Sequence, residues 1–151
     1  MNKGKAWGYG RVLAAGVLVC LSGCGKGSNP APDSRQVLIR LTAANVVGLD
    51  AKYYLYRQPL NGSMQLYSTG GAVDNRQVDK DNKRQLIGEV SRVEIVFDAV
   101  KASNSVRPGP GAHYIAEILV DGTVTSRAVI DSTTPINANG NLFAVAEAEI
   151  R

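Results

Sequence analysis

The chain has 151 residues and a formal charge of +4, from 17 basic and 13 acidic side chains. Residues 1–23 hold three of the basic residues and none of the acidic ones, so the other 128 residues are almost neutral. This balance excludes the strongly basic surface on which nucleic-acid binding depends, and we expect no nucleic-acid partner. The 128 residues are enough for one domain with its own hydrophobic core.

Residues 1–23 have the composition of a secretory signal peptide. Lys3, Lys5 and Arg11 precede an apolar run from Val12 to Leu21. A helix that crosses a bilayer needs roughly 20 apolar residues, and this run has about half that number. We therefore predict export and not a transmembrane helix.

The segment ends in Leu21-Ser22-Gly23-Cys24, which resembles the lipobox of bacterial lipoproteins. The resemblance implies signal cleavage between Gly23 and Cys24, followed by a lipid anchor of palmitate-type acyl chains on Cys24. Two or more acyl chains hold a protein stably on a membrane, which would be its partner here. Gly25, and not Asp, follows the cysteine, and in enteric-type bacteria this pattern implies the outer membrane of the cell envelope. The alternative is an ordinary signal peptide with a cysteine near its cleavage site.

The predicted mature chain has no cysteine other than Cys24, because Cys20 lies in the signal segment. No disulfide can form within the domain, so its hydrophobic core must hold the fold. Residues 24–35 are rich in Gly, Ser and Pro. They predict the lipidated cysteine and a flexible linker with a root-mean-square length of about 15–20 Å. The domain is expected to span residues 36–151.

The domain begins with a strand and a hairpin. Alternation of apolar and polar residues over 36–42 predicts a strand that buries Val37, Ile39 and Leu41. Segments 52–59 and 63–69 flank Asn61-Gly62, a strong hairpin signal.

In this hairpin we expect Tyr56 opposite Tyr67, Arg57 opposite Leu66 and Pro59 opposite Met64. The predicted core face carries Tyr53, Leu55, Met64 and Leu66, and the other face carries Tyr54, Tyr56, Tyr67, Gln58 and Gln65.

The middle of the chain is more polar. Residues 70–84 predict a solvated loop. A calcium loop is the alternative, because Asp79 and Asp81 alternate there, but the turn glycine and terminal Glu of an EF-hand are missing. Residues 85–90 are compatible with a short strand. Residues 92–100 alternate strictly and predict a strand, and the Pro/Gly-rich segment 101–111 predicts a loop. The residues of 92–100 expected in the core are Val93, Ile95, Phe97 and Ala99.

A second hairpin is predicted around Asp121-Gly122. The apolar rows on either side of it share one face only if one strand contains an extra residue. We therefore predict a three-residue loop with a bulge, a left-handed Gly122, and Ile118 opposite Val124. A loop over 132–140 and a last alternating strand over 141–150 complete the chain. The two rows are Tyr114, Ala116, Ile118 and Val120, and Val124, Ala128 and Ile130.

Seven or eight short strands without a helical period predict an all-β fold, a single antiparallel β-sandwich of immunoglobulin-like type. The hairpin residues Ile118, Val120, Asp121 and Gly122 fit an I-x-V-D-G pattern. In this the domain resembles the small exported β-sandwich proteins of the MmpS type. The resemblance implies an accessory role in an export system.

The sequence lacks the combinations typical of a catalytic or metal site. His113 is the single histidine, so a multi-histidine zinc site is excluded, and no G-x-S-x-G motif accompanies it. Glu147 and Glu149 lie two residues apart on one strand face, as a catalytic pair would, although surface charges on the wet side of a sheet are the commoner cause. We predict no enzymatic activity, cofactor or metal.

The tyrosines of the first hairpin give the only indication of a ligand. We expect Tyr54, Tyr56 and Tyr67 to cluster beside glutamines on its less apolar face, an arrangement that suits sugar or protein recognition. The alternative is that this face packs on the second sheet, or that the rings only form a stabilising cross-strand pair. We predict a lipid-anchored envelope protein with a non-enzymatic binding or structural domain, whose partner is an envelope protein or a glycan. A carbohydrate-binding module and an accessory subunit of an export system are the alternatives.

Overall fold

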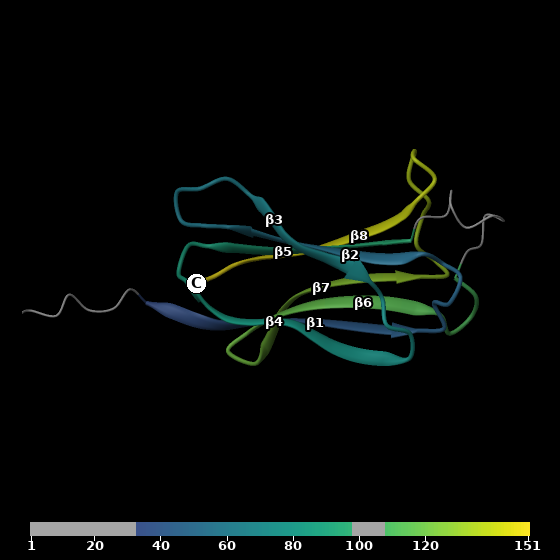
Figure 1. Cartoon of the computed structure of the whole chain (residues 1–151), viewed down its shortest axis with the longest axis horizontal. Coiled ribbons are helices and arrows are strands. Elements are labelled where there is room, and N and C mark those ends of the chain that lie inside the picture. Colours follow the sequence, from purple (N-terminus) through teal and green to yellow (C-terminus); the bar gives the residue numbers. More distant parts are fainter. Residues whose placement is uncertain (1–32, 98–107) are drawn as a thin grey trace, which may run out of the picture. The chain divides into compact units, whose positions relative to one another are not determined.

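The computed structural model describes residues 33–97 and 108–151, which form eight β-strands. The strands are β1 (Ser34–Ala44), β2 (Ala51–Gln58), β3 (Gln65–Gly71), β4 (Arg76–Leu86), β5 (Val90–Phe97), β6 (His113–Val120), β7 (Thr123–Asp131) and β8 (Leu142–Glu149). Two four-stranded antiparallel sheets pack face to face as a β-sandwich, which confirms the all-β prediction (Figure 1). None of the described segments is a helix long and apolar enough to cross a bilayer.

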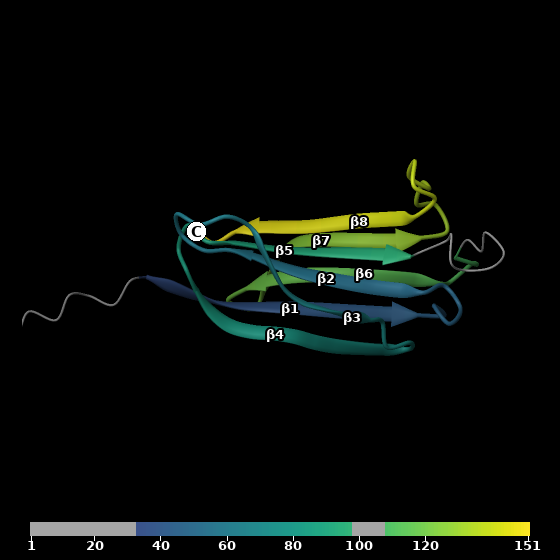
Figure 2. The same ribbon diagram turned by 45° about the horizontal axis from the view of Figure 1, so that its top comes forward.

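The strand order, which the sequence left open, is β4-β1-β6-β7 in one sheet and β3-β2-β5-β8 in the other. In Figure 2, the strands of both sheets run along the long axis of the domain. The hairpins β2–β3 and β6–β7 stay within one sheet, whereas the other consecutive strands lie in different sheets. Each layer therefore combines strands from both halves of the domain.

The core lies between the sheets and follows the predicted alternation. Val37, Ile39 and Leu41 of β1 are buried against the other sheet. From that sheet, Phe97 of β5 lies parallel to Tyr114 of β6, with ring centroids 6.0 Å apart. Ala99 and most of the predicted 101–111 loop lie outside the described residues. The other predicted core positions that are buried include Tyr53, Leu55, Val93, Ile95, Ala116, Ile118, Ala128 and Ile130. The last strand buries Leu142, Ala146 and Ala148, and Ile150 after it is also buried.

The prediction of a loop over residues 70–84 is wrong, because β4 occupies most of that segment. β4 is an edge strand that pairs only with β1, and Lys80 is an extra residue between the Ile39–Asp81 and Arg40–Asp79 pairs. A strand with polar residues on both faces has no hydrophobic period to detect, and charged edges discourage pairing with other chains. β1 also begins at Ser34, inside the predicted linker.

The second hairpin contains the predicted extra residue at a different place. Asp121 and Gly122 both have positive φ and form a two-residue turn, so that Val120 pairs with Thr123. The irregularity lies between Ile118 and Leu119, which pair with Ser126 and Val124. Ala128 and Ile130 reach the core as predicted, but the predicted loop length and the Ile118–Val124 pair are wrong. Val124 is exposed.

The connections gather at two ends of the sandwich (Figures 1 and 2). The start of β1, the turns at 59–64, 87–89 and 121–122, and the C-terminus lie at one end, which we call the entry end. The loops at 45–50, 72–75 and 132–141 lie at the other end, which we call the far end.

Candidate functional site

The outer face of the β3-β2-β5-β8 sheet carries the aromatic residues that the core does not use. Tyr54 and Tyr56 lie two residues apart on β2, on the side opposite the buried Tyr53 and Leu55. Across the sheet, Tyr56 is in line with Arg92 and Glu147, and Tyr54 with Glu94 and Val145. We call this surface the tyrosine face. Its members are Tyr54, Tyr56, Leu66, Arg92, Glu94, Val96, Phe143, Val145 and Glu147.

An ion network lies at the centre of the tyrosine face. Arg92 Nη2 lies 2.7 Å from Glu94 Oε1, and Arg92 Nη1 lies 3.5 Å from Glu147 Oε2. The hydroxyl of Tyr56 donates a hydrogen bond of 3.3 Å to Glu94 Oε2. Partial burial and the adjacent carboxylate raise the pKa of Tyr56 above its ordinary value. The network fixes one guanidinium, two carboxylates and one ring in a single arrangement.

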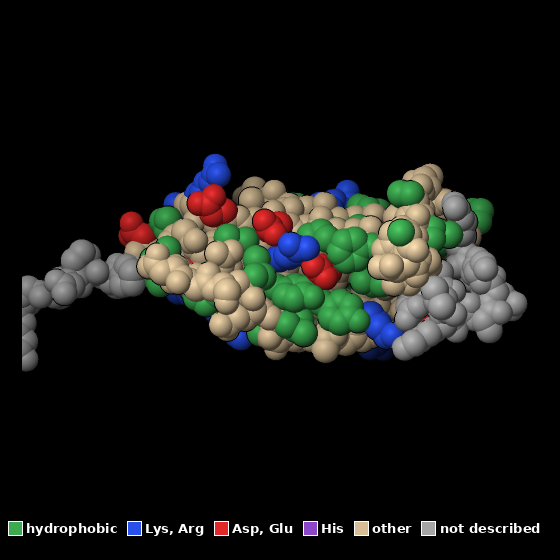
Figure 3. All heavy atoms as spheres, turned by 90° about the horizontal axis from the view of Figure 1, so that it is seen from above, with side chains coloured by type: hydrophobic (Ala, Val, Ile, Leu, Met, Phe, Trp, Pro, Cys, Tyr) green, Lys and Arg blue, Asp and Glu red, His purple; other side chains and the backbone are tan. Residues whose placement is uncertain are grey.

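Apolar side chains surround this network. Figure 3 shows this face, on which a short row of acidic and basic side chains lies among hydrophobic ones. Leu66 of β3 and Phe143 of β8 are exposed, and Val96 and Val145 are half-buried. Exposed aromatic and aliphatic side chains around a held arginine are the composition of protein-recognition surfaces.

The structure does not bring the three predicted tyrosines together. Leu66 and not Tyr67 pairs with Tyr56, because the register shifts between Leu55, which pairs with Ser68, and Tyr56. Tyr67 is the extra residue of this bulge. Leu66 is therefore on the outer face with Tyr56, and the predicted register and the placement of Leu66 in the core are wrong.

Tyr67 is 39% exposed and lies at the edge of the sandwich, where it reaches from β3 to β4 of the other sheet. Its hydroxyl donates a 2.7 Å hydrogen bond to Oδ2 of Asp81, a buried residue of β4 that pairs with the core residue Ile39. Lys83 Nζ lies 5.8 Å from the centroid of the Tyr67 ring. Burial and the carboxylate raise the pKa of Tyr67 far above its ordinary value. Tyr67 therefore closes the open β3–β4 edge of the sandwich, a structural role.

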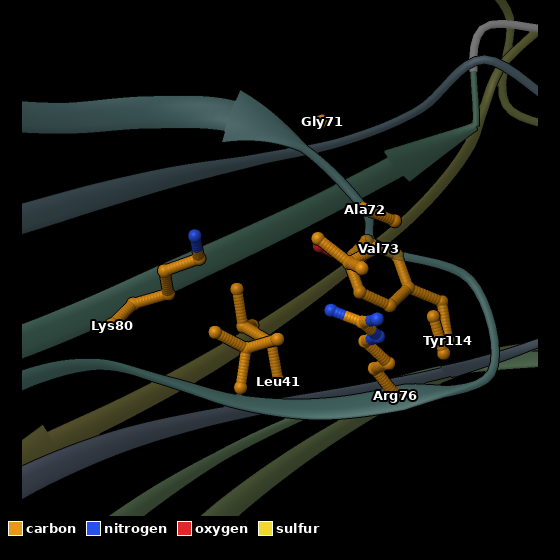
Figure 4. A pocket seen from close by; sticks show the side chains of 9 residues that line it. Leu41, Gly71, Ala72, Val73, Arg76, Lys80 and Tyr114 are labelled. Carbon is orange, nitrogen blue, oxygen red and sulfur yellow. The ribbon is translucent and has the colours of Figure 1, made fainter.

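A small pocket lies near this edge, and Figure 4 shows its lining around Leu41, Arg76 and Tyr114. Tyr114 is buried, its hydroxyl has no hydrogen-bond partner among the described residues, and burial raises its pKa. The pocket encloses about 10 Å³, which is room for about one water molecule. It is too small for an organic ligand.

The residues considered for catalysis and metal binding are dispersed. His113 starts β6 and pairs with Ala44 and Asp131. Glu147 contacts Arg92, and Glu149 contacts Arg151. No group of three or more His, Cys, Asp or Glu side chains in the described part of the chain could hold a metal ion. Gly23 and Cys24 lie outside the described residues, so the anchor stays a prediction.

The sequence missed the residues that complete the tyrosine face. Alternation placed Arg92 and Glu94 opposite the core residues of their strand, but it could not indicate that β8 lies beside β5 or that Phe143 completes the patch. Comparisons with protein families, curated proteins and solved structures found no match to this chain. The resemblance to the MmpS type stays a prediction.

Proposed function

We propose that this protein is a membrane-anchored lipoprotein of the cell envelope and that its β-sandwich is a non-enzymatic binding module. In this proposal acylated Cys24 holds the domain on the membrane, and the tyrosine face binds an envelope protein. The proposed location is the outer membrane.

The observation that supports this proposal is the apolar and aromatic surface around the Glu94–Arg92–Glu147 network. The inner residues of the same strands already supply the core, so folding does not account for exposed Leu66 and Phe143. Tyrosine and arginine contribute more binding energy at protein interfaces than most residues, because they offer large contact areas and fixed polar groups. The network holds one guanidinium between two carboxylates, so it keeps a net negative charge, which suits a partner that brings a basic group to it.

Intact mass spectrometry of the membrane fraction tests the anchor. We expect a species that begins at Cys24 and carries added acyl mass, and we expect this species to be absent from Cys24→Ser. An unmodified soluble species cut at another position would contradict the anchor.

Photo-crosslinking in intact cells tests the binding face. The photoreactive analogue p-benzoylphenylalanine replaces Phe143, which is 40% exposed, or Val129, which is 37% exposed on the outer face of the other sheet. We expect a protein adduct of discrete mass from position 143 and not from position 129, and we expect its loss in Tyr56→Ser. Equal adducts from both positions, or none from 143, would contradict the protein-binding face.

A carbohydrate ligand is the second candidate, because two rings on one face lie beside carboxylates and a guanidinium. Flat aromatic surfaces with adjacent polar groups also suit sugars. Affinity electrophoresis with soluble glycans tests this candidate. Retardation that is lost in Tyr56→Ala but kept in Val129→Ala would favour a sugar over a protein partner.

A further inference from the structure

Two exposed apolar residues lie together where the chain enters the sandwich. Leu60 in the β2–β3 turn is 51% exposed, and Ile87 in the β4–β5 turn is 40% exposed. The Leu60 side chain lies directly against Gly88, the residue that follows Ile87, because a Cβ added to Gly88 would come within 2.8 Å of Leu60 Cδ1. We call Leu60, Ile87 and Gly88 the entry tip.

Hydrogen bonds fix the entry tip to the first described residue. The backbone N–H of Ile87 donates to the carbonyl oxygen of Asp33 at 3.1 Å. The Gly88 N–H donates to the carbonyl oxygen of Ile150 at 2.8 Å, so the tip also meets the last residues of the chain. Arg57 Nη2 lies 2.7 Å from Glu89 Oε2 and ties β2 to the β4–β5 turn. These interactions hold the backbone of the entry tip in place beneath its apolar side chains.

The number of residues between Cys24 and Asp33 limits how far the entry tip can lie from an acyl anchor on Cys24. Eight residues separate Asp33 from Cys24, so the two lie at most about 30 Å apart even when this segment is fully extended. The eleven residues of β1 span about 36 Å, so the far end lies about that much farther along the sandwich. An acyl anchor on Cys24 would therefore hold the entry tip next to lipid and leave the far end away from it.

We propose that the entry tip docks into the membrane interface, with Leu60 and Ile87 among the lipid headgroups and upper acyl chains. The proposal rests on the acylation of Cys24. The occupant is a lipid surface and not a protein, because the anchor brings lipid to the tip at high effective concentration. At this end Arg35 pairs with Asp121 and Arg151 with Glu149, while Arg84 donates a hydrogen bond of 3.2 Å to Ser34 Oγ. The proposed contact is made by the apolar side chains and does not require anionic lipid.

Docking orients the whole domain. The strands run from the entry end to the far end (Figures 1 and 2), so the tyrosine face would stand along the membrane normal and stay open to a partner. Val47 at the far end is 82% exposed and is the matched control, an apolar side chain more exposed than either tip residue but distant from the anchor.

The predicted mature chain has no tryptophan, because Trp7 lies in the signal segment, so one introduced tryptophan is a clean reporter. Leu60→Trp, Ile87→Trp and Val47→Trp are made in the full acylated protein, which is reconstituted into phosphatidylcholine vesicles with brominated acyl chains. We expect blue-shifted, quenched emission from positions 60 and 87 and unchanged emission from position 47. The quenching should persist in high salt, and Ile87→Asp should abolish it in the Leu60→Trp protein, whereas Val73→Asp at the far end should not.

Three results would overturn the proposal. Acylated, vesicle-bound protein without quenching at 60 and 87 would exclude docking and leave the lipoprotein assignment intact. Equal quenching at 47 would show that the domain has no preferred end toward lipid. Protein without acyl mass that fails to attach to vesicles would overturn the anchor and the docking together.

Discussion

The β2–β3 hairpin has two sides that differ in what their side chains do. On the inner side, Leu55 is fully buried and Tyr67 bonds the buried carboxylate of Asp81 across the gap between the sheets. On the outer side, Leu66 is exposed and the half-buried Tyr56 donates a hydrogen bond to Glu94 in the ion network. Residues that are adjacent in sequence, such as Leu66 and Tyr67, therefore differ in their surroundings and in their expected roles. The inner side holds the sandwich together, and the outer side carries the surface that we propose for binding.

The largest difference between the two sides is expected for leucine. Leu55→Ala should lower the free energy of unfolding by about 2–5 kcal/mol, because it leaves a cavity in the core. Leu66→Ala on the outer side should change it by about 0.5 kcal/mol or less. Urea unfolding of the protein measures both, and similar losses would show that the outer side also stabilises the fold.

A smaller loss is expected for the inner tyrosine. Tyr67→Phe removes the hydroxyl that donates to Asp81 and should cost about 1–3 kcal/mol, because the buried carboxylate loses its hydrogen bond. Tyr54→Phe on the outer side is the matched change and should cost about 0.5 kcal/mol or less. A neutral Tyr67→Phe would mean that water replaces the hydroxyl and that the edge is open.

Alkaline pH should also weaken the contribution of the inner tyrosine. The folded state raises the pKa of Tyr67 above its ordinary value of 10.0, so the unfolded chain loses this proton first as the pH rises. The stabilisation is fully present below pH 10.0 and is lost progressively above it. Urea midpoints across this range should fall with pH, and the fall should be shallower in Tyr67→Phe. Identical slopes in both proteins would contradict a Tyr67 hydroxyl held by Asp81.

The smallest effect on stability is expected for the outer hydrogen bond. Tyr56→Phe removes a 3.3 Å contact with Glu94 at the surface and should cost about 0.5 kcal/mol or less. Thermal unfolding measures this change in stability. A larger loss of stability would show that the Glu94–Arg92 network stabilises the fold, which would contradict a role in binding alone.

Sequence patterns predicted the two sides of this hairpin only in part. Tyr53 and Leu55 alternate along β2 and were correctly placed in the core, because a regular strand exposes one face to each side. The bulge at Tyr67 was not predictable, since its cause is a partner, Asp81, on a strand of the other sheet. A single extra residue exchanges the faces of everything that follows, so Leu66 and Tyr67 changed places.

The same reason explains the other errors. β4 has polar residues on both faces, and only its pairing with β1 makes it a strand. The extra residue near Thr125 was expected from the apolar rows, but its position depends on packing across the sheets. Hydrophobic period therefore predicted the buried residues of the regular strands. Tertiary partners determined where the strand pairing is interrupted, and next to these interruptions Leu66 and Val124 are exposed.

The most direct test measures stability and partner adduct together in two variants. In protein carrying p-benzoylphenylalanine at position 143, Tyr56→Ser and Tyr67→Phe are compared for the free energy of unfolding and for crosslink yield. We expect Tyr56→Ser to keep the free energy of unfolding and to lose the adduct. We expect Tyr67→Phe to lower the free energy of unfolding and, under conditions in which the protein is folded, to keep the adduct. An unchanged adduct in Tyr56→Ser would contradict the claim that the outer side of the hairpin is the binding surface.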